Sequence, residues 1–108
     1  MTTKLRAPVN LSKESQRWWR KIVDEYGIAD SGGLLILKTL CEALDTALEA
    51  QRILDKEGIT IKDRFGAIKS HPICAVLRDA RSQVYTGIKS LNLDLEPLNS
   101  GVGRPPGR

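Results

Sequence analysis

The sequence has few of the residues from which metal and redox sites are built. It contains two cysteines, Cys41 and Cys74, and one histidine, His71. The cysteines form no Cys-x-x-Cys pair, which argues against a structural zinc site. If their segments pair as antiparallel helices, they lie about 20 Å apart along the helix axis, too far for a disulfide. We therefore expect two small apolar core residues, no metal and no cofactor.

Long hydrophobic runs and aromatic residues are also scarce. No apolar run approaches the ~20 residues that a membrane-spanning helix needs. The first ten residues carry Lys4 and Arg6 without the hydrophobic stretch of a secretory signal. The sequence thus predicts a cytoplasmic protein with no membrane partner. With only two tryptophans, two tyrosines and one phenylalanine in 108 residues, the core should be thin, so we expect self-association.

No motif for nucleotide binding or catalysis is present. The sequence has no Gly-x-x-x-x-Gly-Lys-Ser/Thr loop, which argues against an ATPase. His71 stands beside Pro72 at an expected helix start, where a capping or packing role is more typical than general-base catalysis. We find no catalytic constellation and predict that the chain is not an enzyme.

The net charge is +4, but the positive and negative residues are segregated along the chain. Residues 1–23 hold six bases and one acid, residues 24–58 hold three bases and eight acids, and residues 59–90 hold six bases and two acids. This order suits a polyanion partner, or attraction between basic and acidic parts of neighbouring subunits. Each cluster taken alone is more typical of a solvated face than of a binding site, but the whole pattern slightly favours a polyanion partner.

Hydrophobic periodicity predicts a mainly α fold. We expect three helices over residues 12–26, 34–56 and 72–91, with a short β-hairpin over residues 59–69 between the second and third. The short connection makes the second and third helices an antiparallel pair. Gly32 and Gly33 should weaken the first turn of the second helix, so its regular part is expected to begin at Leu34.

The chain divides into three segments. Residues 1–10 form a flexible basic arm, residues 11–91 a helical domain for oligomerisation and DNA binding, and residues 92–108 a tail rich in proline and glycine.

The first helix carries the most suggestive binding pattern, because Trp18-Trp19-Arg20-Lys21 interleaves aromatic and basic residues. We expect at least one tryptophan to be a core anchor, which leaves the bases to contact phosphates. Such contacts give affinity with little sequence information. The candidate DNA-binding residues are Lys4, Arg6, Lys13, Arg17, Arg20 and Lys21, with a second patch at Arg64 and Lys69 on the hairpin.

The second helix has two apolar stripes, one broad and one narrow. One stripe can cover the third helix, while the other needs a partner, either the first helix or another subunit. The residues we expect at an interface between subunits are Leu37, Leu40, Leu44 and Leu48 of the broad stripe and Ile36 and Ile53 of the narrow one.

The ordered set of short motifs resembles the phage terminase small subunit family, in the branch with an Ala-Pro arm and a later His-Pro. Each motif alone is weak, but together they run through nearly the whole chain. The matching residues are Ala7-Pro8, Leu11-Ser12, Trp18-Trp19, Ile22-Val23, Gly27-Ile28, Leu54, Glu57 to Thr60, Gly66, Lys69, His71-Pro72, Leu91, Leu93 and Gly103 to Pro106.

This resemblance implies a role in viral genome packaging within the infected bacterial host. Proteins of this family assemble into rings, bind the packaging start site on double-stranded DNA and engage the terminase large subunit, which carries the ATPase and nuclease. The family pattern tends to have glycine where this chain has Asn92, and more bases where it has Asp94 and Glu96. These departures argue against DNA binding near residue 95 and favour contact of the tail with the large subunit.

A different class of function is also open. The acidic second helix and its second apolar stripe would suit a protein-interaction adaptor or inhibitor that never touches DNA. A small transcriptional regulator is a third possibility, but the helix after Gly27 is apolar and acidic, which is wrong for a recognition helix.

Overall fold

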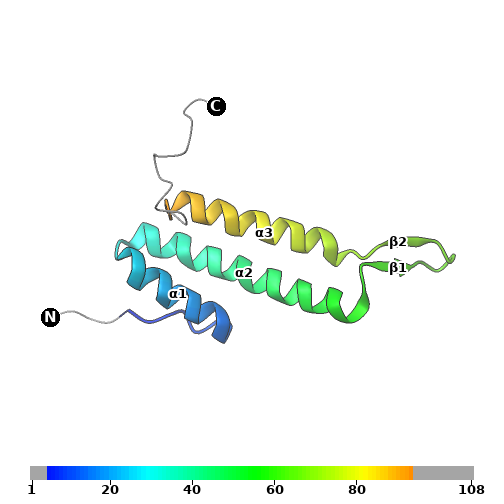
Figure 1. Cartoon of the computed structure of the whole chain (residues 1–108), viewed down its shortest axis with the longest axis horizontal. Helices are drawn as coiled ribbons and strands as arrows, with labels where there is room; N and C mark the ends of the chain where they lie inside the picture. The colour runs from blue at the N-terminus through cyan, green and yellow to red at the C-terminus, as the bar shows by residue number, and fades with distance from the viewer. Residues whose placement is uncertain (1–4, 94–108) are drawn as a thin grey trace, which may run out of the picture.

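A computed structural model of the chain describes residues 5–93, in which three helices and one hairpin follow one another (Figure 1). Helix α2 lies in the middle, with α3 antiparallel along one side and α1 against the other, near the N-terminal half of α2. This arrangement confirms the mainly α fold with a hairpin between the second and third helices. The elements are α1 (Lys13–Tyr26), α2 (Ser31–Glu57), β1 (Thr60–Lys62), β2 (Ile68–Ser70) and α3 (Ile73–Ser90).

Helix α1 begins and ends at the residues that the sequence predicted. The Ser12 side chain accepts a hydrogen bond from the backbone N–H of Ser15, so it caps the first turn. Gly27 has a φ of 64° and closes the last turn with a hydrogen bond to the Val23 carbonyl. Glycine takes this left-handed conformation without the steric cost that a Cβ brings.

Helix α2 begins at Ser31, and the residues before Leu34, whose turn we expected to be weakened, are already helical. Asp30 caps it, since its carboxylate accepts a hydrogen bond from the N–H of Gly33 at 2.7 Å. A Cβ on Gly33 would lie 2.9 Å from the Asp30 carboxylate. The glycine that we expected to weaken this turn therefore allows the cap to close, because only a residue without a side chain leaves the carboxylate room.

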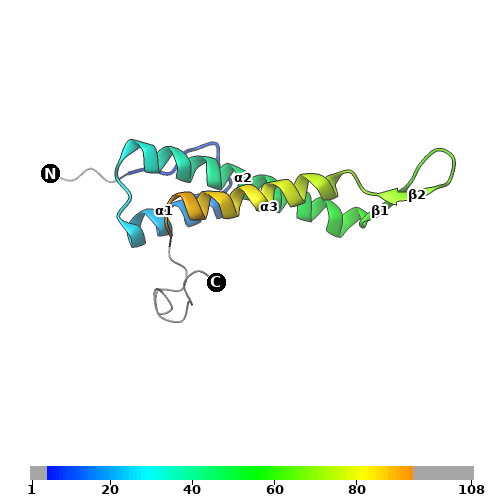
Figure 2. The same cartoon turned by 90° about the horizontal axis from the view of Figure 1, so that it is seen from above.

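The hairpin is two short antiparallel strands, in which Ile61 lies opposite Lys69 and Lys62 opposite Ile68. The strands cover residues 60–62 and 68–70, close to the predicted span of 59–69. Asp63 organises the turn: its carboxylate accepts hydrogen bonds from the N–H groups of Phe65 and Ala67, at 2.8 and 3.0 Å. The hairpin projects past the ends of α2 and α3 in both views (Figure 2).

Helix α3 starts one residue later and ends one residue earlier than predicted. Pro72 stands just before the first helical residue, Ile73, instead of inside the first turn. At the other end, Asn92 has a φ of 57° and its N–H donates to the Lys89 carbonyl, while the N–H of Leu93 donates to Ile88. This is the Schellman arrangement, which favours glycine or asparagine at the left-handed position.

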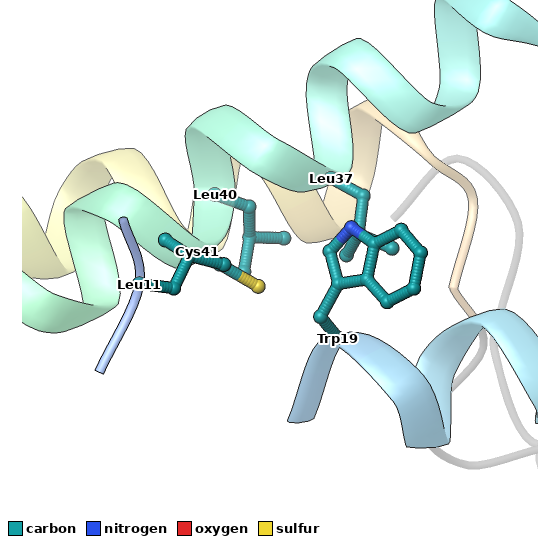
Figure 3. Close-up of a cluster of buried hydrophobic side chains, with 5 residues drawn as sticks. All are labelled: Leu11, Trp19, Leu37, Leu40 and Cys41. Carbon is teal, nitrogen blue, oxygen red and sulfur yellow. The ribbon is translucent and has the colours of Figure 1, made fainter. Parts of the chain in front are cut away.

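The hydrophobic core consists of two clusters along α2. The first joins the N-terminal segment, α1 and α2 through Leu11, Trp19, Leu37, Leu40 and Cys41, with Val84 and Ile88 of α3 packed against it (Figure 3). The second lies further along the α2–α3 pair and is built mainly from small residues. Its members are Ala47, Ala50 and Leu54 of α2 and Leu77 and Ala80 of α3.

Helices α2 and α3 approach closely where Gly87 faces Leu40. A Cβ on Gly87 would lie 2.9–3.0 Å from three carbons of the Leu40 side chain. Real Cβ atoms essentially never come this close, so the approach requires glycine. Our sequence analysis gave Gly87 no role.

Candidate functional site

The four candidate bases of α1 are all exposed and lie on the side of the helix away from the core. Within one helix, residues three and four apart share a face. Lys13, Arg17, Arg20 and Lys21 follow this spacing, while Ser15 and Trp19 lie on the opposite, buried side. We call these four bases the α1 basic face.

The tryptophan pair divides between core and surface, as we expected of at least one of them. Trp19 is 4% exposed and packs into the first core cluster, whereas Trp18 is 44% exposed. The ammonium of Lys21 lies 5.1 Å from the centre of the Trp18 ring, a cation–π contact. Trp18 therefore helps to hold one member of the α1 basic face in place.

A partly buried hydrogen-bond network links α1 to α2. The carboxylate of Asp45 accepts from the backbone N–H of Ser12 at 2.8 Å and from the hydroxyls of Ser12 and Ser15 at 2.5 Å each. Burial acts to raise the pKa of Asp45, but these hydrogen bonds outweigh it and hold the pKa below its usual value. Because Ser15 is fully buried, the network sets which side of α1 faces solvent.

Sequence analysis missed this network. The available signal was an aspartate one turn after Cys41, on the inner side of a helix, opposite two serines at the start of another helix. Acids rarely lie on such a side unless they have partners.

The remaining candidate bases do not join the α1 basic face. Arg6 is exposed in the segment before α1, and Lys4 lies outside the described residues. Arg64 and Lys69 are on the hairpin, at the far end of α2 from α1 (Figure 1). Lys69 pairs with Asp63 at 3.7 Å, and Arg64 lies over the Phe65 ring at 5.7 Å. The structure thus shows two separate basic regions.

The residues that we expected at a subunit interface divide between core and surface. Leu37 and Leu40 are buried within the chain itself, at 0% and 4% exposed, because α1 and α3 cover them. Ile36 and Leu48 are each 36% exposed, and Leu44 and Ile53 are half-buried. The helix pair also exposes two apolar side chains that we did not predict: Leu35 is 64% exposed and Tyr85 is 65% exposed.

Two apolar grooves flank the α2–α3 pair. Ile36 and Leu40 of α2 and Thr86 and Gly87 of α3 line one of them. The other lies nearer the hairpin, where Leu54, Leu77 and Tyr85 contribute apolar surface. Both edges of the helix pair thus offer apolar surface.

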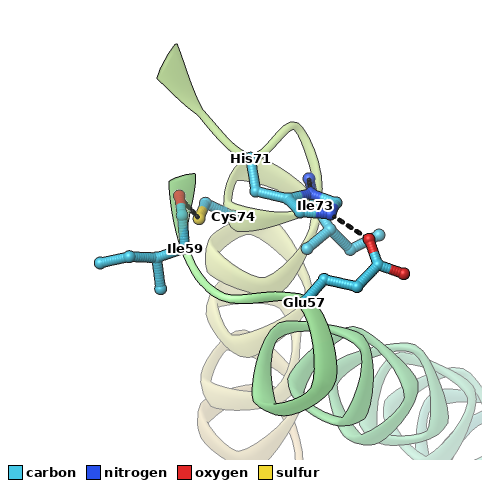
Figure 4. Close-up of polar contacts among 5 residues, drawn as sticks. All are labelled: Glu57, Ile59, His71, Ile73 and Cys74. Atoms are coloured by element: carbon cyan, nitrogen blue, oxygen red, sulfur yellow. Dashed lines mark hydrogen bonds and ion pairs between the residues drawn. The ribbon is translucent and has the colours of Figure 1, made fainter. Parts of the chain in front are cut away.

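His71 has the capping role that we predicted for it. Its Nδ1 accepts a hydrogen bond from the N–H of Ile73 at 3.1 Å, and its Nε2 lies 2.8 Å from the Glu57 carboxylate (Figure 4). Its backbone N–H donates to the carbonyl of Ile59 at 2.8 Å. The side chain of His71 thus links the end of α2 to the start of α3, and its backbone adds a link to the base of the hairpin.

The cysteines differ in their surroundings. Both are free; Cys41 is fully buried, while Cys74 is half-buried and packs against the second core cluster. Burial, reinforced by the charges of Asp45 and Glu42, raises the pKa of the Cys41 thiol to about 11. A protonated, enclosed thiol is a poor nucleophile, so Cys41 serves packing.

Over residues 5–93 there is no group of histidine, cysteine and carboxylate side chains placed to hold a metal ion. Among the same residues, no helix is both long enough and apolar enough to cross a membrane.

Comparison with known proteins gives one match. The model of the family described as "Phage terminase, small subunit" matches residues 15–96, well over half of the chain. The matched span runs from the first turn of α1 past the end of α3, so it takes in the α1 basic face from Arg17 onward and the whole hairpin. No curated protein and no solved structure shows a significant match.

Proposed function

The chain belongs to the phage terminase small subunit family, and on that basis we propose that it is the non-catalytic subunit that selects viral DNA for packaging. It assembles into a ring, binds double-stranded DNA at the packaging start and engages the large subunit with its ATPase and nuclease. It acts in the cytoplasm of the infected bacterial host. It needs no cofactor, because the hydrolytic chemistry belongs to the large subunit.

The α1 basic face is the observation that carries the DNA-binding part of the proposal. Four exposed bases lie along one side of a helix whose other side is fixed by Trp19 and by the Asp45 network. A rigid row of positive charge suits the phosphate backbone, and its contacts release counterions from DNA. We place this face on the DNA and treat the exposed Arg6 as an additional phosphate contact.

The proposed subunit contact uses the exposed apolar side chains of the helix pair. Four large apolar side chains of the helix pair are too exposed to contribute much to the stability of a single chain: Leu35, Ile36, Leu48 and Tyr85. A monomeric protein seldom exposes so many apolar side chains on one pair of helices. Half-buried Leu44 and Ile53 extend this surface, while Leu37 and Leu40 support it from beneath. The acidic character of α2 also complements the basic α1 of a neighbouring copy.

DNA binding is tested by reversing charge on α1. The variant R17E/R20E/K21E should lose retention of a duplex in a mobility-shift assay and keep its oligomeric mass. The wild-type chain should show log K falling linearly with log salt, with each phosphate contact contributing about 0.9 to the slope. A matched control, R52E/K56E/K89E, changes the charge equally on exposed positions of α2 and α3.

Two outcomes would contradict this placement. If the control loses DNA as completely as the α1 variant, the binding follows net charge rather than the α1 basic face. If wild-type affinity is flat between low and moderate salt, phosphate contacts do not drive binding.

The acidic α2 and the apolar grooves favour a second candidate, an adaptor that docks onto another protein without DNA. It would give a monomer or dimer in solution and no DNA shift at any salt concentration. The same two measurements separate it from the packaging subunit.

A further inference from the structure

The tip of the hairpin combines exposed apolar and basic side chains in a way that neither the core nor α1 requires. At the tip, Phe65 is 85% exposed and Ile68 69%, and at the base Ile59 is 66% exposed. A two-stranded hairpin is marginally stable by itself and gains from packing its apolar side chains. Here they are exposed instead, on a hairpin that projects beyond the ends of the helices (Figure 2). This exposure points to a partner outside the chain.

The base of the hairpin is held firmly, so its tip is presented at a defined place. His71 donates its backbone N–H to Ile59 and places its ring 2.8 Å from the carboxylate of Glu57. The thiol of Cys74 adds a long contact, 3.8 Å, to the carbonyl of Ile59 (Figure 4). At the other end, the two hydrogen bonds to Asp63 fix the turn that carries Phe65.

The charge of the tip identifies the kind of partner. The hairpin has three bases and one acid, and that acid, Asp63, is already engaged by the turn and by Lys69. Within residues 5–93, Lys62 has no ion-pair partner, and Arg64 contacts only the Phe65 ring. An exposed phenylalanine on the same short hairpin as two available bases is unsuited to an apolar protein groove but complements DNA, where phosphates flank stacked bases.

We propose that this hairpin is a DNA-deforming element: Phe65 enters a groove as a wedge against a base step while Lys62 and Arg64 contact the flanking phosphates. Two-stranded ribbons fit DNA grooves, and inserted phenylalanine side chains unstack base steps and bend the duplex. Pyrimidine–purine steps kink most easily. Insertion of Phe65 therefore makes DNA affinity depend on how easily the bound sequence bends, whereas the phosphate contacts of α1 do not depend on sequence. The inference rests on the proposed DNA-binding function and adds to it.

The experiment measures DNA bending by energy transfer between dyes at the two ends of a duplex. The duplex has about 30 base pairs, with one central TA step between G·C-rich arms. The full-length chain is added to saturation, and a mobility shift confirms that the duplex is bound. We compare the wild type with F65A, with F65L, which keeps an apolar tip, and with V76A, which trims an exposed apolar residue on α3.

Wild type, F65L and V76A should raise energy transfer above that of the free duplex. F65A should remain bound and keep the wild-type mass, but return energy transfer to the value of the free duplex. K62A/R64A should lower the salt slope by about two, one for each phosphate contact. An F65A complex as bent as wild type overturns the proposal. So does a change in oligomeric mass on F65A substitution, which would assign the tip to another copy of the chain.

Failure of the proposed function gives a different result. If no variant shifts the duplex at any salt concentration, DNA binding itself is absent, and the hairpin inference falls with it. If the wild type binds with a steep salt slope but leaves the duplex straight, only the hairpin inference is wrong.

Discussion

Ser15 of α1 donates a hydrogen bond from its hydroxyl to the carboxylate of Asp45 of α2 across 2.5 Å; Ser15 itself is fully buried, and the hydrogen bond is partly buried. This pair fixes the rotation of α1. The rotation in turn decides that Trp19 faces the core and that Lys13, Arg17, Arg20 and Lys21 face solvent. A polar contact in the interior thus determines the orientation of the candidate DNA-binding surface.

Replacing Asp45 tests this relationship. The variant D45N removes the charge that accepts three hydrogen bonds from Ser12 and Ser15, and leaves buried Ser15 poorly paired. We expect a loss of about 1–3 kcal/mol in the free energy of unfolding, measured by denaturant titration at matched protein concentration. The control D79N alters an exposed aspartate of α3 and should change stability by less than about 0.5 kcal/mol. Equal effects for both variants would contradict the role of Asp45.

The same residue predicts a pH dependence. The hydrogen bonds lower the pKa of Asp45 in the folded chain relative to its value of about 3.9 in an unfolded one. The folded state therefore binds a proton at Asp45 less readily. Its stabilisation is fully present above the unfolded pKa and is lost as pH falls through the folded pKa. The stability difference between wild type and D45N should be constant near neutral pH and shrink below about pH 4. A difference that grows in acid would mean that the charged form is not the stabilising one.

Replacing Gly87 with alanine changes the free energy of unfolding in opposite directions according to helix propensity and to packing. Alanine is favoured over glycine in helices by about 1 kcal/mol. At Gly87, however, the new Cβ would meet Leu40 at 2.9–3.0 Å. We expect G87A to lower the unfolding free energy by about 1–3 kcal/mol, since the α2–α3 contact must open. G32A is the matched control: its Cβ meets only Asp30 at 3.7 Å, so it should be neutral or stabilising. Stabilisation by G87A would contradict the close approach.

Asn92 marks the left-handed residue that ends α3. With its φ at 57°, glycine should replace it with little change in melting temperature. Asparagine tolerates the left-handed region because its short polar side chain can hydrogen-bond locally, and alanine lacks that group, so N92A should cost about 1 kcal/mol. Thermal unfolding of N92G and N92A, followed by circular dichroism, measures the difference. If N92G and N92A have the same melting temperature, the Schellman arrangement does not contribute to stability.

Much of the fold was predictable from local patterns. The caps at Ser12 and Gly27, the antiparallel second and third helices and the turn at Asp63 all depend on residues close in sequence. The glycine pair was misjudged because propensity describes an isolated helix. In the chain, the cap from Asp30 requires a residue without a side chain at Gly33.

The contacts between distant residues were not predictable in the same way. The Ser15–Asp45 pair joins positions 30 residues apart, and the Gly87–Leu40 approach depends on how two helices cross. Helical periodicity placed Leu37 and Leu40 on an apolar stripe, but it could not say whether α1, α3 or another subunit covers that stripe. The exposure of Leu35 and Tyr85, and of Phe65 on the hairpin, likewise became visible only in three dimensions.

The central claim is that these chains assemble into a closed ring that holds DNA. Its most direct test is absolute mass by light scattering on a sizing column at moderate salt, with and without duplex DNA. The account predicts one discrete species whose mass is many times the 12.0 kDa of a single chain. It also predicts that L35E/L48E reduces this mass, because the two changes place a charge among the exposed apolar side chains at each edge of the helix pair. A mass of one or two chains in both conditions would contradict the ring and leave the adaptor as the better account.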